Sequence, residues 1–181
     1  MNSVLAYGLS LIILLAILAL AAYVDRIYSE MGKFLAREYQ DNIDAWEQVV
    51  EPRLRLGRES IALSASVLRQ LTLAAIALFS GLRLYSNNAL LPSIVQTPSV
   101  SEIAVAACEL VLLILIFDRL LPQLLFTRTR GLWIARIRPV LQALFYLILP
   151  VTLLLGLLLS IAALAAPDDS AVEDHPSEAK I

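Results

Sequence analysis

The stretch Leu112–Thr129 has the sequence LLILIFDRLLPQLLFTRT, which is apolar enough to cross a lipid bilayer. It nevertheless contains the charged couplet Asp118–Arg119 and a proline, Pro122. A charged side chain at the centre of a membrane-spanning helix costs about 2.5–3.5 kcal/mol on insertion scales, so it needs a partner. Proline has no backbone N–H, so Pro122 also frees a carbonyl near Asp118. The segment is therefore either an oxygen-bearing site inside the membrane or the place where a helix leaves it.

The composition of the whole chain is typical of an integral membrane protein. Of its 181 residues, 59% are hydrophobic and only 17% are charged, whereas soluble domains are about 25% charged. The sequence has no basic patch interleaved with aromatic residues, which argues against nucleic-acid binding. It also has no paired His/Cys cluster, nucleophile elbow or glycine-rich phosphate loop, so we expect no enzyme. The partner that the composition predicts is the lipid bilayer.

Apolar runs predict three membrane-spanning helices, at residues 4–24, 61–84 and 103–117, the third extended by the stretch quoted above. At 1.5 Å per residue, about 20 residues cross a hydrocarbon layer of about 30 Å. A fourth apolar run, residues 140–166, is interrupted by Pro150. It either spans the membrane or forms two shorter helices that return or lie in the interface.

Residues 26–58 are polar overall but carry apolar residues at helical spacing, which predicts two amphipathic helices along the headgroups. The couplet Asp41–Asn42 offers a break or a cap between them. A plain soluble loop would explain the charges but not the periodicity. The periodic apolar residues are Ile27, Met31, Phe34 and Leu35 in the first piece and Trp46, Val49, Val50 and Leu54 in the second.

These elements predict an all-α integral membrane fold with three transmembrane helices, juxtamembrane amphipathic helices and a fourth, proline-broken apolar segment. Residues 1–166 form the membrane domain, and residues 167–181 form an acidic linker or disordered tail. The only histidine, His175, lies in this tail, where a solvated side chain is expected rather than a metal ligand.

Basic residues flank the spans unevenly, which predicts the orientation in a bacterial plasma membrane. Around the connection between the second and third spans the only basic residue is Arg83, at the end of the second span, so the N-terminus is predicted to be outside and both basic segments cytoplasmic. The C-terminus is then cytoplasmic as well, unless residues 140–166 span. The basic residues are Lys33, Arg37, Arg53, Arg55 and Arg58 after the first span and Arg128, Arg130, Arg136 and Arg138 after the third.

Two ionisable residues at comparable depths in neighbouring spans suggest a pair. Arg69 lies in the second predicted span and Glu109 in the third. Together they either line an ion path or neutralise each other between helices, and we favour the neutralising clamp. The couplet Asp118–Arg119 needs partners in the same way.

Oxygen-bearing side chains accompany Arg69 on the second span and serve either as ligands of a hard cation or as hydrogen-bond formers between helices. We assign no catalytic residue and no metal ligand. These oxygen-bearing residues are Ser64, Ser66, Gln70 and Thr72. The candidates for an ion path or for helix bracing are Ser66, Arg69, Gln70, Glu109, Asp118, Arg119 and Pro122.

The order of these segments, together with FDRLLPQLLFTRT and the later IRPVLQALFYLILPV, resembles the transmembrane domain of the CNNM/CorC family. This family comprises the cyclin M-like and hemolysin-related proteins linked to magnesium efflux. Its third span ends in Gly-Glu, two apolar residues and Pro-Lys, of which the apolar pair and Pro122 are present. Its later proline–leucine–tyrosine–proline run is matched by Pro139, Tyr146 and Pro150, and its first helix ends, as here, in an acid, Asp25. Ser29 stands in the amphipathic helix that follows. The resemblance covers residues 4 to about 166.

The chain departs from the family pattern where the family holds its ion. Asp118, Arg119 and Gln123 stand at the positions of the family's glycine, glutamate and lysine. The Gly-Asn element of its second helix falls near Arg69–Gln70, and its first-helix serine falls near Ala22. In the family, small and oxygen-bearing residues hold a dehydrated Mg²⁺ ion, which arginines would repel. One interpretation is that a guanidinium takes the place of the ion.

The resemblance implies the membrane domain of a divalent-cation (Mg/Co) transporter or efflux-related protein with a degenerate ion site. It alone implies Mg²⁺, a homodimer and a pair of CBS modules downstream in a longer chain. The alternative is a non-transporting structural or regulatory membrane protein in which intramembrane arginines brace the helices. A third hypothesis is an unrelated four-span protein with its C-terminus outside.

Overall fold

The computed structural model describes residues 2–31, 40–54, 56–88, 98–129, 131 and 133–165. These residues form helices and short connections and include no strand, which confirms the predicted all-α fold. The predictions for residues 167–181, including His175, and for Phe34 and Leu35 fall outside the described residues.

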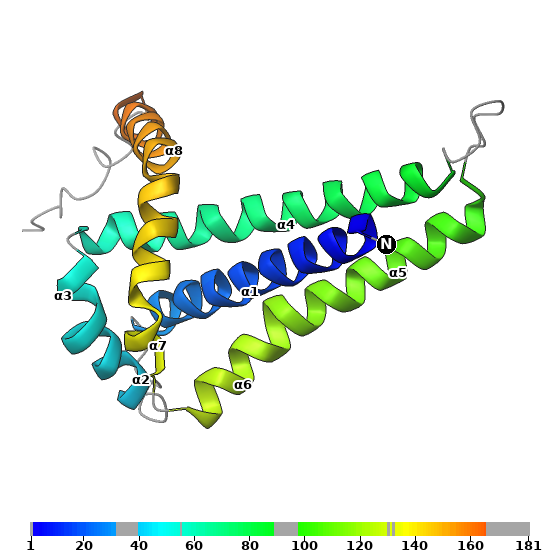
Figure 1. Ribbon diagram of the computed structural model, residues 1–181. Helices are drawn as coiled ribbons and strands as arrows, with labels where there is room; N and C mark the ends of the chain where they lie inside the picture. Colours follow the sequence, from blue (N-terminus) through cyan, green and yellow to red (C-terminus); the bar gives the residue numbers. More distant parts are fainter. Residues whose placement is uncertain are drawn as a thin grey trace, which may run out of the picture.

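The long helices α1 (Asn2–Glu30) and α4 (Arg58–Asn88) pack against each other along their length (Figure 1). A third rod beside them begins with α5 (Val100–Ile114), continues through one π-helical turn, η3 (Leu115–Leu120), and ends with α6 (Leu121–Arg128). The C-terminal part of this rod, η3 and α6, packs against α1. The three rods correspond to the three spans predicted from sequence.

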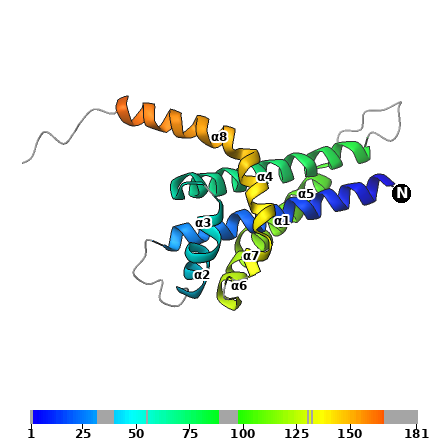
Figure 2. The same cartoon turned by 60° about the vertical axis from the view of Figure 1, so that its left-hand side comes forward.

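The last helix, α8 (Arg138–Ala165), crosses α4 steeply instead of running beside it (Figures 1 and 2). Pro150 lies inside α8, so the proline does not split the segment into two helices as one prediction had it. Because proline lacks an N–H, the carbonyl of Tyr146 one turn earlier loses its usual donor, which favours a bend rather than a break. Figure 2 shows α8 changing direction about midway.

Four helical rods among the described residues are long and apolar enough to cross a membrane. Most side chains of these helices are apolar, and most of them are not buried by the rest of the protein. Such an apolar surface is stable in a lipid bilayer and not in water, so the chain is a membrane protein. The four segments are Leu5–Glu30, Arg58–Leu84, Val100–Arg128 and Arg138–Ala162.

A segment of short helices between α1 and α4 covers the end of the bundle where α1 ends. It consists of α2 (Gln40–Ala45), the π-helical turn η2 (Trp46–Val50) and α3 (Glu51–Leu54), which follow one another directly. The break or cap predicted at Asp41–Asn42 is wrong, because both residues lie inside α2. Asn42 instead connects three elements: it accepts a hydrogen bond from Tyr23 Oη (2.9 Å) and donates one to the Phe126 carbonyl (2.8 Å).

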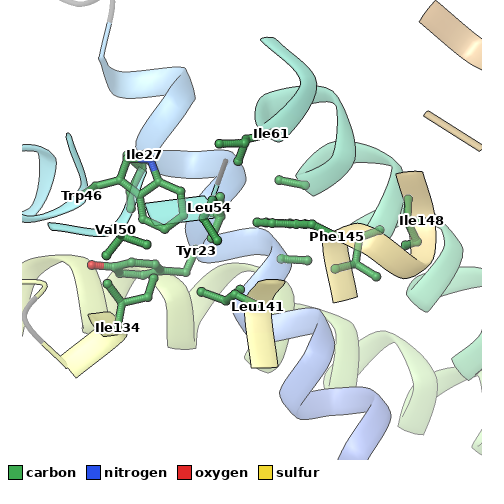
Figure 3. Close-up of a cluster of buried hydrophobic side chains, with 14 of the residues drawn as sticks. Tyr23, Ile27, Trp46, Val50, Leu54, Ile61, Ile134, Leu141, Phe145 and Ile148 are labelled. Atoms are coloured by element: carbon green, nitrogen blue, oxygen red, sulfur yellow. The ribbon is translucent and has the colours of Figure 1, made fainter. Parts of the chain in front are cut away.

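The main apolar core lies at this same end (Figure 3). Trp46, Val50 and Leu54 are completely buried, so the periodic apolar residues of this segment face the bundle. The Trp46 indole N–H donates a hydrogen bond of 3.0 Å to Tyr28 Oη, which satisfies its polar atom within the core. The cluster joins α1, α2–α3, α4, α7 (Trp133–Arg136) and α8 through Tyr23, Ile27, Ile61, Ile134, Leu141, Phe145 and Ile148.

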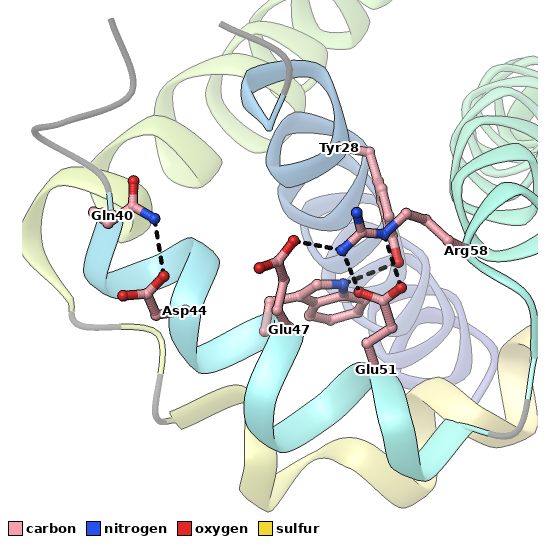
Figure 4. A network of polar contacts seen from close by, with 7 residues as sticks. Tyr28, Gln40, Asp44, Glu47, Glu51 and Arg58 are labelled. Carbon is pink, nitrogen blue, oxygen red and sulfur yellow. Dashed lines mark hydrogen bonds and ion pairs between the residues drawn. The ribbon is translucent and has the colours of Figure 1, made fainter. Parts of the chain in front are cut away.

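A polar network lies on the surface of the same end (Figure 4). The Arg58 guanidinium at the start of α4 contacts Glu47 and, with Nε 3.0 Å from Oε1, Glu51. Gln40 and Asp44 form a separate hydrogen bond of 2.9 Å on α2. Because the Arg58 side chain is 53% exposed, these ion pairs close the turn between α3 and α4 but add little stability.

Gly131 lies in the connection between α6 and α7, at a position that favours glycine. Its φ is +72°, and a Cβ built there would lie 3.1 Å from Asn42 Cα and 3.2 Å from Ala45 Cβ. Both the backbone conformation and the close approach of α2 therefore disfavour a side chain at this position.

We expect Gly131→Ala to lower the free energy of unfolding by about 1–3 kcal/mol, because alanine is strained at this φ and α2 must move. Thermal unfolding of the purified protein in detergent, followed by circular dichroism, measures the loss. Gly81→Ala is the matched control, since no atom lies within 4 Å of a Cβ there. Equal melting temperatures for the two variants would contradict the close packing of α2 against Gly131.

Candidate functional site

Three charged side chains from α1, α4 and η3 meet inside the bundle. The Arg69 guanidinium on α4 donates from Nε to Asp118 Oδ1 (2.6 Å) and from a terminal nitrogen to Asp118 Oδ2 (2.7 Å). Its other terminal nitrogen donates to Asp25 Oδ2 on α1 (2.8 Å). We call Asp25, Arg69 and Asp118 the Arg69 clamp. The paired bonds to Asp118 are the strong, directional arrangement that arginine forms with a carboxylate.

Burial makes the Arg69 clamp energetically important. The Asp118 side chain is only 5% exposed, while those of Arg69 and Asp25 are 25% and 28% exposed. An ionised carboxylate as buried as Asp118 is stable only with a partner. Arg119 adds a second, weaker contact, with Nε 3.6 Å from Asp118 Oδ2, but its side chain is 72% exposed and contributes little.

The π-helical turn η3 brings Asp118 to Arg69. At its end the Leu121 N–H donates to the Ile116 carbonyl, five residues earlier, and Pro122 follows with no N–H of its own. A proline in an ordinary α-helix clashes with the carbonyl four residues before it, which here is that of Asp118, and a wider turn relieves the clash. The same order occurs at η2, which ends at Val50 and is followed by Pro52. Pro122 itself is buried against α1 together with Phe126.

A cavity of about 240 Å³ surrounds the Arg69 clamp. Its lining is polar and carries equal numbers of acidic and basic side chains, so it is close to neutral. Among the described residues, no group of three or more His, Cys, Asp or Glu side chains is placed to hold a metal ion. The cavity is lined by Asp25, Glu30 and Asp118, by Arg26, Arg69 and Arg119, and by Ala22, Ser29 and Pro122.

The structure brings together Arg69, Asp118, Arg119 and Pro122 of the predicted candidates. The predicted pairing of Arg69 with Glu109 is wrong. Glu109 lies beside Arg83 instead, with Oε1 3.8 Å from a terminal guanidinium nitrogen. Arg83 lies about 21 Å further along α4 than Arg69 at 1.5 Å per residue, so Glu109 is at a different depth from the clamp.

The remaining polar candidates on α4 lie outside this cavity. Ser66 is half-buried and Gln70 is exposed. Ser64 Oγ donates to Thr152 Oγ1 on α8 over 3.4 Å, and Thr72 Oγ1 donates to the Leu68 carbonyl (2.7 Å). Ser64 and Thr72 therefore form hydrogen bonds within and between helices.

Asp25 is the clamp residue whose role the sequence did not reveal. It ends the apolar run of α1, where an acid is ordinarily an interfacial residue, and only the packing of α1 against α4 brings it to Arg69. Arg26 and Glu30, one residue and about one turn further along α1, line the same cavity. The contact between Asp25 and Arg69 could have been suggested by one sequence feature. An acid stands at the end of the first span, and an arginine lies inside the second.

No family model, no curated protein and no solved structure matches the sequence.

Proposed function

We propose that this chain is a CNNM/CorC-like membrane domain, related to divalent-cation efflux proteins, in which Arg69 occupies the place of the transported ion. Its role is then structural or regulatory, with the Arg69 clamp bracing α1, α4 and η3. The observation that carries this proposal is the guanidinium of Arg69 within 2.8 Å of two carboxylates from two other helices.

The chemistry of the clamp supports bracing over cation binding. A dehydrated Mg²⁺ ion needs about six oxygen ligands at about 2.0–2.1 Å in octahedral geometry. Here the oxygens of Asp118 already accept two hydrogen bonds from Arg69, and Asp25 accepts a third. A divalent cation would have to displace a positive charge from a buried carboxylate, which both electrostatics and geometry oppose.

A second candidate function is divalent-cation transport through the same cavity. The observation that favours it is the presence of three carboxylates, Asp25, Glu30 and Asp118, around one 240 Å³ space. Transport would require Arg69 to leave Asp118 during the cycle, so that these oxygens become available to Mg²⁺ or Co²⁺.

We propose that the N-terminus is outside and the C-terminus cytoplasmic in a bacterial plasma membrane. The start of α4, the end of α6, the short helix α7 and the start of α8 lie at the end of the bundle where α1 ends (Figure 1), and each carries an arginine, which the positive-inside rule favours for a cytoplasmic end. The crossing of α8 over α4 supports three spans and a last helix that stays on that side. By the same resemblance we propose a homodimer, with CBS modules following in a longer chain. The gathered arginines are Arg53, Arg58, Arg128, Arg136 and Arg138.

Thermal unfolding with added Mg²⁺, Co²⁺ or Mn²⁺ separates the two functions. We expect the melting temperature of the wild-type protein to stay unchanged with millimolar cation, because a ligand stabilises only a protein that binds it. In Arg69→Gln, Asp25 and Asp118 lose their guanidinium, and we expect Mg²⁺ to raise the melting temperature.

Arg119→Gln is the matched control, since it removes an exposed arginine of the same cavity and leaves both carboxylates bound to Arg69. It should behave like the wild type. Stabilisation of the wild type by Mg²⁺ that disappears in Asp118→Asn would contradict the bracing function and support transport.

A further inference from the structure

A second cavity, of about 370 Å³, lies between α4 and α5 at the opposite end of the bundle from the apolar core. This volume is in the range of small-ligand sites. Its wall combines apolar side chains with one arginine, two glutamates and two serine hydroxyls. The lining residues are Ser80, Arg83 and Leu84 of α4 and Ser101, Glu102, Val105, Ala106 and Glu109 of α5.

Arg83 is held in place but keeps free hydrogen-bonding capacity. Its guanidinium carbon lies 4.8 Å from the centroid of the Tyr7 ring, which itself stacks on Phe79 at 5.0 Å. Its contact with Glu109 is 3.8 Å, far looser than the 2.6–2.8 Å bonds of the Arg69 clamp. At 3.8 Å the two groups attract each other without sharing a hydrogen bond. Each therefore remains able to bind a further partner.

The cavity lies where a phospholipid headgroup would meet the protein. The apolar span on α4 ends at Leu84 and that on α5 begins at Val100, so the cavity opens at the edge of the hydrocarbon layer. Leu78, Leu82 and Val105 are between 57% and 68% exposed on the same two helices. They offer an apolar surface along which acyl chains can lie.

We propose that this cavity binds the headgroup of phosphatidylethanolamine. The lipid phosphate accepts hydrogen bonds from Arg83 and from the Ser80 and Ser101 hydroxyls, and the primary ammonium donates to Glu109. Glu102 Oε2 already accepts the Ser99 N–H at the start of α5 (2.8 Å), and Ser101 Oγ lies 3.1 Å from Ser99 Oγ, so Glu102 contributes its second oxygen, Oε1, to the ammonium. The negative phosphate and the positive ammonium of the headgroup thus each face side chains of opposite charge in the cavity.

The lining distinguishes this lipid from the common alternatives. A quaternary ammonium, as in phosphatidylcholine, donates no N–H hydrogen bond and is recognised mainly by aromatic faces, and none of the lining residues is aromatic. Phosphatidylglycerol has no cation and would leave Glu102 and Glu109 beside an anionic headgroup. Neither lipid satisfies both sides of the cavity.

Native mass spectrometry of the delipidated protein in detergent tests the proposal with all three lipids. We expect wild-type protein to retain phosphatidylethanolamine at least about tenfold more tightly than the other two, the equivalent of one charge-assisted hydrogen bond. Arg83→Gln and Glu109→Gln should each remove most of this preference. Soluble phosphoethanolamine should compete only weakly, because it lacks the acyl chains.

Arg128→Gln and Glu59→Gln are the matched controls, since each removes one charge of the same sign from an exposed position at the other end of the bundle. Both should bind like the wild type. Equal retention of the three lipids, or an unchanged preference in both cavity variants, would overturn the proposal. Competition by soluble phosphoethanolamine as strong as by the lipid would show a small-molecule site and overturn the lipid assignment.

Discussion

Arg69→Met is expected to lower the free energy of unfolding by about 3 kcal/mol, the lower end of the cost of breaking a buried ion pair. Methionine fills much of the same volume but leaves Asp118, whose side chain is 5% exposed, without its two hydrogen bonds. Asp25 loses its partner as well, but it is 28% exposed and water can replace the bond.

Chemical or thermal unfolding of the purified variant in detergent measures this loss. Asp25→Asn should cost clearly less than Asp118→Asn, because the exposed member of the Arg69 clamp makes one bond to Arg69 and the buried member makes two. The double variant Arg69→Met/Asp118→Leu should recover most of the stability, since it leaves no buried charge. Additive losses in the double variant would show that the two residues act independently.

Trp46→Ala is expected to lower the free energy of unfolding by about 3–5 kcal/mol, the usual cost of truncating a large buried aromatic side chain. Trp46, in η2, is completely buried in the core that the α2–α3 segment forms with α1, and its removal opens a cavity and leaves Tyr28 Oη without its donor. The loss would show that this polar-looking segment is part of the core.

Trp46→Phe and Val49→Ala serve as controls in the same unfolding measurement. Phenylalanine keeps most of the packing and loses only the hydrogen bond to Tyr28, so we expect a cost of about 1 kcal/mol. Val49, on the same turn, is only half-buried, and its truncation should cost less than that of Trp46. A Trp46→Ala variant as stable as Val49→Ala would mean that α2–α3 does not pack as described.

Much of the fold could be predicted because hydrophobic length and period are local properties. The apolar runs of α1 and α4 and the spacing of Trp46, Val50 and Leu54 indicated the helices and the buried face of the α2–α3 segment. Asn42 misled because asparagine favours helix caps, whereas here its amide joins Tyr23 to the Phe126 carbonyl. That use depends on contacts between residues far apart in the sequence.

The candidate site could be predicted only in part for the same reason. The cost of a charge in an apolar span correctly directed attention to Arg69 and Asp118. The choice of partner depends on the relative depth of two antiparallel helices, and the third rod runs, as the extended third span predicted, to Arg128. This places Asp118 opposite Arg69 and moves Glu109 up to Arg83.

The wide turn η3 also changes which side of its rod faces the bundle. An additional residue in a helix offsets everything beyond it by about 100° of rotation, since an α-helix has 3.6 residues per turn. Before this offset, α5 has no buried residue, whereas Asp118 within η3 and Pro122 and Phe126 beyond it form one buried row. The first part of the rod is therefore exposed along its length, and the second part packs one face against the bundle. A homologous helix without the widened turn would need one residue fewer in this region to keep the same residues buried. An alignment of the two sequences would then require a one-residue gap between positions 115 and 120.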